Sequence, residues 1–104
     1  MATQPVTVAR IFLREGEHQL NRLIDFLHHE EKVAGVTVLR GIAGFGPDGR
    51  MHTASLVDLS LDLPLVLEFY DTPERVVAVL ERLEALMQVP HVISWSACRH
   101  LPGA

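Results

Sequence analysis

Residues 44–52 read GFGPDGRMH, and the pattern of the residues after them decides the fold. The stretch satisfies G-x-G-x-x-G, the pattern of dinucleotide-binding turns, in which the glycines lie between a strand and a helix. The residues before it, VTVLRGIA at 36–43, do have a strand pattern, but RMHTASLVDLSL at 50–61 has the pattern of a second strand. No P-loop lysine follows the glycines either. The sequence therefore predicts a hairpin loop here and argues against a doubly wound nucleotide-binding fold.

The glycines of this stretch fall into two groups. Gly49 follows Pro47 and Asp48, and this combination is typical of a turn because proline presets φ and glycine tolerates positive φ. Gly41, Gly44 and Gly46 come before the turn, where a hairpin alone does not require them. Glycine at a strand end often marks the close approach of another backbone or of a ligand. Both explanations stay open from the sequence.

The hydrophobic periodicity of the rest of the chain predicts four strands and two helices. Period-two stretches with many β-branched residues indicate strands, and apolar residues spaced by three and four indicate amphipathic helices. The predicted order is strand 6–14, helix 16–33, strand 36–43, strand 53–70, a helix that starts within 71–74 and ends at Pro90, and strand 92–99.

Each predicted helix has an apolar stripe and recognisable ends. The first stripe is Leu20, Leu23, Ile24 and Leu27, and the second is Val76, Val79, Leu80, Leu83 and Met87. We expect Gly35 to stop the first helix. The second helix has two alternative N-caps: Asp71 gives a capping-box spacing with Glu74, and Thr72 places Pro73 at the first helical position.

The order βαββαβ predicts an α+β fold of the ferredoxin-like type, a four-stranded antiparallel sheet with two helices on one face. The 104 residues suggest one domain, 1–104. In the first strand Ala9, Ile11 and Leu13 share one face, while Val8 and Phe12 share the other. Because the second face is also apolar, we expect an oligomer to cover it.

Composition narrows the class of protein further. The net charge of −4 argues against a nucleic-acid binder. No 18-residue apolar run and no signal peptide are visible, so we expect a cytoplasmic protein with no membrane insertion. The single cysteine, Cys98, fits a reducing compartment, and we expect a buried thiol.

Three segments carry a resemblance to a known family. AGVTVLRGIAGFG at 34–46, the pair His52-Thr53, and LSLDLPLVLEFYDTPE at 59–74 resemble the hallmark sequences of the PII-like "domain of unknown function 190" proteins. The likeness covers nearly the whole chain. The resemblance implies a ferredoxin-like homotrimer, similar to PII nitrogen-signalling proteins, which bind adenine nucleotides in clefts between subunits. It also implies that Gly44-Phe45-Gly46 is the root of an arm that contacts partners.

The resemblance assigns ligand contacts to the strand end, the arm and the last strand. The implied ligand-binding residues are Arg40, Gly41, Gly44, Phe45, Gly46, His52, Thr53 and Arg99. For Arg40 the residues alone leave a second interpretation, an ion pair with Glu68 or Asp58 across the sheet. Two features depart from PII proteins: residues 87–91, MQVPH, replace a phosphate-binding GDGK loop, and the arm is short.

The function indicated is that of a PII-like regulatory protein with a small anionic effector, such as ATP, ADP, AMP or cyclic AMP. The resemblance implies a membrane transporter or channel as its partner. Two alternatives remain, a ligand-free structural trimer and a metal-binding trimer of the copper-tolerance type. The sequence shows no catalytic constellation and predicts no enzyme. The adjacent His28 and His29 point apart on a helix, so we predict no metal site.

Overall fold

The computed structural model describes residues 1–53, 63–88 and 91–103. Its elements, in chain order, are strand β1 (Ala2–Arg14), 3-10 turn η1 (Glu15–Glu17), helix α1 (Leu20–Asp25), π-helical turn η2 (Phe26–Glu30), strands β2 (Gly35–Arg40), β3 (Ala43–Gly44), β4 (His52–Thr53) and β5 (Pro64–Asp71), helix α2 (Pro73–Leu86) and strand β6 (Val92–Leu101). The predicted third strand, 53–70, is therefore described only at its two ends, because residues 54–62 lie outside the described ranges.

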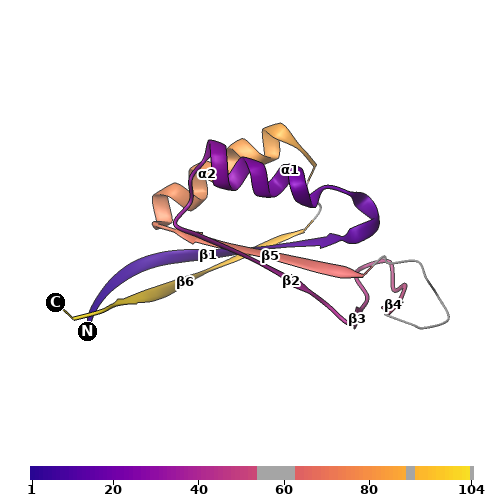
Figure 1. Cartoon of the computed structure of the whole chain (residues 1–104), viewed down its shortest axis with the longest axis horizontal. Helices are drawn as coiled ribbons and strands as arrows, with labels where there is room; N and C mark the ends of the chain where they lie inside the picture. The colour runs from indigo at the N-terminus through magenta and orange to yellow at the C-terminus, as the bar shows by residue number, and fades with distance from the viewer. Residues whose placement is uncertain (54–62, 89–90, 104) are drawn as a thin grey trace.

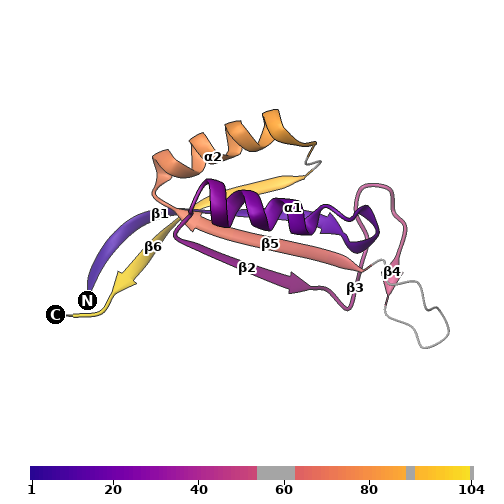
Figure 2. The ribbon, with the colours of Figure 1, turned by 45° about the horizontal axis from the view of Figure 1, so that its top comes forward.

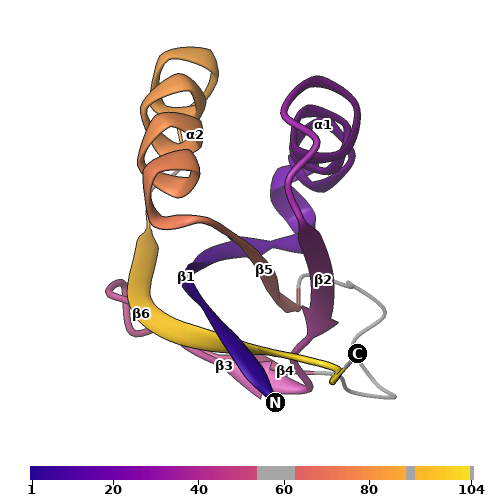
Figure 3. The same ribbon diagram turned by 90° about the vertical axis from the view of Figure 1, so that its left-hand side faces the viewer.

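Four of the strands form one antiparallel sheet in the order β2-β5-β1-β6. Both helices lie on the same side of it (Figure 1) and side by side when the molecule is viewed from its end (Figure 3). This is the strand order and layering of a ferredoxin-like sandwich, with β3 and β4 added as a separate two-stranded hairpin. The predicted fold class is confirmed. It could be predicted because the hydrophobic periodicity of the sequence indicated the strands and helices.

The core lies between this sheet and the two helices. Ala9, Ile11 and Leu13 of β1 lie opposite Phe69, Leu67 and Leu65 of β5, and all six are buried. The helices cover these residues with Leu23, Phe26 and Leu27 of the first helical segment and with Val76, Val79 and Leu83 of α2, and Met87, just after α2, packs against the same core. Burial of side chains of this size stabilises the fold by about 1.5–3 kcal/mol each. Both predicted stripes are confirmed, and Leu20, Ile24 and Leu80 are partly buried against the same core.

The start of α2 agrees with the sequence prediction, whereas the end of the first helical segment differs from it. Thr72 is the N-cap of α2 and Pro73 occupies its first turn, which decides between the two predicted caps. The prediction that Gly35 stops the first helix is wrong. The helical segment ends at Glu30, the positive φ of 52° falls on Lys32, and Gly35 already belongs to β2. Gly35 is needed instead for space, because an added Cβ would lie 2.3 Å from the Tyr70 ring.

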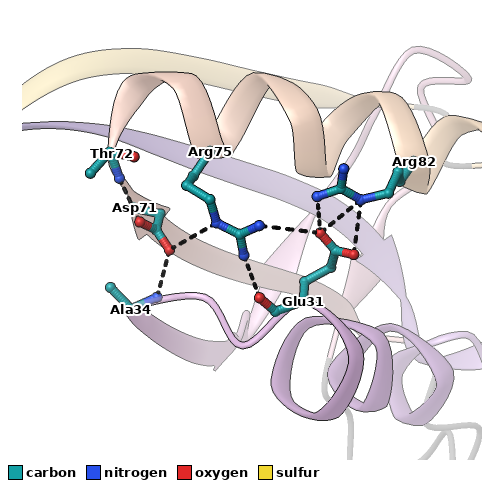
Figure 4. Close-up of polar contacts among 6 residues, drawn as sticks. All are labelled: Glu31, Ala34, Asp71, Thr72, Arg75 and Arg82. Carbon is teal, nitrogen blue, oxygen red and sulfur yellow. Dashed lines mark hydrogen bonds and ion pairs between the residues drawn. The ribbon is translucent and has the colours of Figure 1, made fainter.

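A network of charged side chains, which we call the Glu31 clamp, joins the end of η2 to α2 (Figure 4). The Arg82 Nε lies 2.9 Å from both carboxylate oxygens of Glu31. Arg75 donates to the Glu31 main-chain carbonyl and lies between Glu31 and Asp71. Asp71 Oδ2 in turn accepts the Ala34 N–H at 3.1 Å. The clamp therefore fixes the connection that leads into β2.

The Glu31 carboxylate is well shielded, with only 10% of its side chain exposed. The hydrogen bond from Arg82 lowers the pKa of Glu31 below its ordinary value of 4.5, and the charges of Arg82 and Arg75 add to this effect, while burial opposes it. The carboxylate therefore stays ionised at neutral pH and holds both arginines.

The start of β1 and the end of β6 extend beyond the helices (Figure 2). The first strand begins at Ala2 rather than at residue 6, because residues 2–5 pair with residues 98–101 of β6. Cys98 lies on this two-stranded extension and is exposed, so the prediction of a buried thiol is wrong. The extension lengthens the molecule to 52 Å along its longest axis.

The sheet face that the helices leave uncovered carries the predicted apolar residues. Residues directly opposite each other in an antiparallel sheet share a face, which places Val8 with Tyr70 and Trp95, and Phe12 with Val66. Three large apolar side chains on this face are strongly exposed: Leu39 (50%), Ile93 (47%) and Trp95 (41%). At its centre Arg10 pairs with Glu68 at 2.9 Å and lies over the Trp95 ring.

Candidate functional site

The root of the arm is a point where two backbone segments approach closely. The Gly41 N–H donates to the Pro64 carbonyl at 2.8 Å. A Cβ added at Gly41 would lie 2.8 Å from Pro64 Cγ, and one added at Gly44 would lie 3.3 Å from the same atom. Gly41 and Gly44 therefore let the chain leave β2 against the proline ring that begins β5. This contact favours the structural explanation for these two glycines.

The arm itself is a short hairpin with a regular turn. Ala43 and Gly44 of β3 pair with Thr53 and His52 of β4. At the tip the Gly49 N–H donates to the Gly46 carbonyl at 2.9 Å, and Gly49 has a φ of +74°. The Asp48 side chain accepts the Arg50 N–H at 3.0 Å, which supports the turn. The predicted Pro47-Asp48-Gly49 turn is confirmed.

The arm exposes both main chain and large apolar side chains. No atom of the described residues lies within 4 Å of a Cβ added at Gly46, so this part of the backbone is open to a ligand. Ile42 is 83% exposed, Phe45 69% and Met51 60%. Large apolar side chains exposed on one short arm are candidates for contact with a partner.

Arg40 lies at the foot of the arm, at the end of β2, with half of its side chain exposed. Its Nε is 2.6 Å from the Glu15 carboxylate of η1. The predicted pairing with Glu68 is wrong, because Glu68 lies on the opposite face and pairs with Arg10, whereas the other predicted partner, Asp58, lies outside the described residues. A guanidinium can bind an oxyanion, but here the Glu15 carboxylate already offsets its charge and competes with such a ligand.

The two residues that follow the arm are placed by the hairpin. His52 lies opposite Gly44 and is half-buried, and Thr53 lies opposite Ala43. The structure thus brings seven of the eight predicted ligand residues to one end of the sheet: Arg40, Gly41, Gly44, Phe45, Gly46, His52 and Thr53.

Arg99 does not join them. It lies on the extension of β6, with its guanidinium 5.9 Å from the centroid of the Tyr70 ring. The end of β6 and the β3–β4 arm lie at opposite ends of the long axis of the molecule (Figure 1). Within one chain, Arg99 and the arm root are therefore separate sites.

Two residues at the arm root were missed by sequence reasoning. Glu15 is the partner of Arg40, and Pro64 is the residue against which Gly41 and Gly44 pack. These contacts join positions at least 20 residues apart in the chain, so no local pattern signals them. The DLP segment at 62–64 indicated only that a strand could begin at Pro64, because proline is typical of the first residue of a strand. It did not indicate the contact with the glycines.

Within the described ranges, no three His, Cys, Asp or Glu side chains are grouped so that they could hold a metal ion. His29 pairs with Asp25 at 2.7 Å, and His28 contacts the His29 ring, on an exposed helical turn. In the same residues, no helix is long and apolar enough to cross a membrane.

Comparisons with known proteins agree with this architecture. Residues 6–98 match the model of the family DUF190, described as "Uncharacterized ACR". A UPF0166 protein of Methanocaldococcus jannaschii is 29% identical over 101 residues, which cover 92% of each chain. Among solved structures, CPII of Thiomonas intermedia K12, a nitrogen regulatory PII-like protein bound to ADP, AMP and bicarbonate, superimposes with a TM-score of 0.66 at 16% identity, over 98% of this chain and 100% of that one. A "putative PII-like signaling protein" of Thermus thermophilus gives a TM-score of 0.64 at 19% identity, over 95% and 91%.

Proposed function

Because this chain belongs to the DUF190 family and has a PII-like fold, we propose that it is a regulatory protein that binds a small anionic effector at the arm root. The observation that carries the proposal is Arg40, a half-exposed guanidinium placed where the arm leaves the sheet. Beside it, the open backbone at Gly46 and the side of the hairpin at His52 provide polar groups that a phosphate can meet.

The effector we propose is an adenine nucleotide, ATP, ADP, AMP or cyclic AMP. The bound ADP and AMP of CPII support this class of ligand, although that protein shares only the fold with this chain. Arg40 supplies a cation for the phosphate, and the exposed Phe45 supplies a flat apolar ring beside it. The short arm and the absence of a GDGK sequence favour a ligand with few phosphates.

The assembly we propose is a homotrimer with the ligand between subunits. The uncovered sheet face supports it, because Leu39, Ile93 and Trp95 are too exposed for a face that stays in water. The position of Arg99 supports it as well. Since Arg99 lies at the far end of its own chain, it completes the phosphate site only when a neighbouring copy provides it.

Ligand binding then acts on the arm. An anion that takes the Arg40 guanidinium displaces the Glu15 carboxylate, and both residues flank the segment that leads to the hairpin. The exposed Ile42, Phe45 and Met51 of the arm change position with it and contact the regulated protein, for which we propose a transporter or channel.

Calorimetry with the four nucleotides tests the ligand. Arg40→Gln should weaken binding about tenfold to 100-fold, because a hydrogen bond to a charged group contributes about 1.5–3 kcal/mol. Glu15→Gln should tighten binding by up to about fivefold, since it removes a competing, partly buried charge. Arg22→Gln, the same loss of charge on α1, should leave binding unchanged. No heat with any nucleotide at millimolar concentration would refute the proposal.

A further inference from the structure

A cavity of about 760 Å³ lies beside the C-terminal turns of α2 and shares no lining residue with the arm root. Its floor is apolar and is formed by Leu80 and Leu83 of α2, by Met87, which follows the helix, and by Val92 of β6. Its size falls within the range of small-molecule sites, about 300–1,000 Å³. The function proposed above does not use it.

Among the described residues, the polar side chains at the rim of this cavity are acidic or amide groups. Glu17 of η1 and Glu84 of α2 lie on it, together with Gln19 and Gln88. Glu17 accepts the Arg14 N–H at 3.2 Å and lies 3.6 Å from the Arg14 Nε. Among the residues that line the cavity in the described part of the chain there is no lysine, arginine or histidine.

The position of Glu84 is unusual for a helix. It lies in the last turn of α2, where the free carbonyl groups give the helix a partial negative charge. A carboxylate is disfavoured there and a cation is favoured, yet the last turn of α2 carries no basic residue. The Arg22 guanidinium of α1 donates to the Leu86 carbonyl at this helix end, at 3.3 Å. The negative potential at the mouth of the cavity therefore comes from the Glu17 and Glu84 carboxylates.

Gln19 provides a second, independent sign of a missing partner. Its Oε1 is buried and accepts no hydrogen bond from the described residues. Its Nε2 donates one long hydrogen bond, 3.4 Å, to the Gln88 carbonyl. An unsatisfied buried acceptor costs free energy, and this amide can turn its oxygen toward a donor by giving up only that long bond.

We propose that this cavity binds a small organic cation, a protonated amine with an apolar body. The ammonium group lies at the rim, between the Glu17 and Glu84 carboxylates and the Gln19 oxygen, and the apolar body packs on Leu83, Met87 and Val92. A bare metal ion fits less well, because no three His, Cys, Asp or Glu side chains of the described residues are grouped to hold one and the cavity has an apolar floor.

The three methionines of the chain make the test specific. In protein labelled with ¹³C at the methionine methyl groups, Met87 reports on the cavity and Met51 on the arm. Hexylammonium should shift the Met87 signal, with an affinity of about 1 mM for a probe of this size, and leave Met51 unchanged. Hexanol should bind more weakly than hexylammonium, and hexanoate more weakly still.

The variant Glu17→Gln/Glu84→Gln should weaken hexylammonium binding about tenfold and leave hexanol binding unchanged. Glu81→Gln is the matched control, because Glu81 is an exposed acid of the same helix outside the cavity, and it should bind like the wild type. The unchanged hexanol affinity verifies that the double variant keeps the cavity. The proposal is overturned if hexanoate binds as tightly as hexylammonium, if the double variant keeps the wild-type affinity, or if Met87 does not shift by about 20 mM probe.

Discussion

Gly41→Ala tests whether the glycines of the arm serve the backbone or a ligand. The new Cβ would lie 2.8 Å from Pro64 Cγ and 3.3 Å from the Pro64 carbonyl oxygen. Carbon atoms pack best at about 3.5–4.0 Å, so the two segments must separate by roughly 1 Å. The proline ring cannot rotate away, and the hydrogen bond from Gly41 to the Pro64 carbonyl resists the movement.

Overpacking of this kind costs about 1–3 kcal/mol. For a domain of this size, that should lower the midpoint of thermal unfolding by about 5–20 °C, measured by circular dichroism at 222 nm. Gly46→Ala is the matched control, because no described atom lies within 4 Å of its added Cβ and its φ is not positive. It should be neutral or raise stability by about 0.4–1 kcal/mol, since alanine restricts the unfolded chain.

The two variants separate the two explanations of the glycine-rich stretch. If Gly41→Ala unfolds at the wild-type temperature, the close approach to Pro64 is not the reason for this glycine. If Gly46→Ala is instead the destabilising variant, the arm packs differently from the hairpin described above. Either result would refute the structural argument for the arm root.

Other consequences can be measured in the same way. Glu31→Gln should destabilise the protein at pH 7 relative to its exposed neighbour control Glu30→Gln. Because the pKa of Glu31 is lowered in the folded state, this difference should be constant above about pH 6 and shrink as the pH falls below the ordinary value of 4.5, and a difference that grows at low pH would contradict the clamp. Gly49→Ala, at a φ of +74°, should cost about 1–2 kcal/mol by the same thermal assay, and no loss would show that the turn is not left-handed. If the proposed homotrimer forms through the uncovered sheet face, Ile93→Glu should lower the mass in sedimentation from three copies of the 11.6 kDa chain to one; an unchanged mass would mean that this face is not the interface.

Much of the fold could be predicted from the sequence because each element depends on its own residues. The stripe from Val76 to Met87 specified α2, and the alternation of Ala9, Ile11 and Leu13 specified the buried face of β1. The predictions that failed concerned features that depend on contacts between distant residues or that have only a weak sequence pattern. Lys32 takes the left-handed position that Gly35 was expected to take, because the Glu31 clamp holds the connection and Gly35 is needed beside Tyr70.

Only part of the candidate site could be predicted, again because some of its contacts join residues that are distant in the sequence. A family resemblance could place Arg40 and the glycines at one strand end, but it could not place Glu15, which approaches from η1 through the fold alone. This contact changes what the site requires of a ligand. Arg40 is already paired with a carboxylate. An anion therefore binds there only if its own interactions are stronger than the Arg40–Glu15 ion pair. A ligand that makes a single contact with Arg40 gains little from the exchange. Binding therefore needs additional groups, from the open backbone at Gly46 or from an Arg99 that a neighbouring copy supplies, and the strength of the site should depend on assembly.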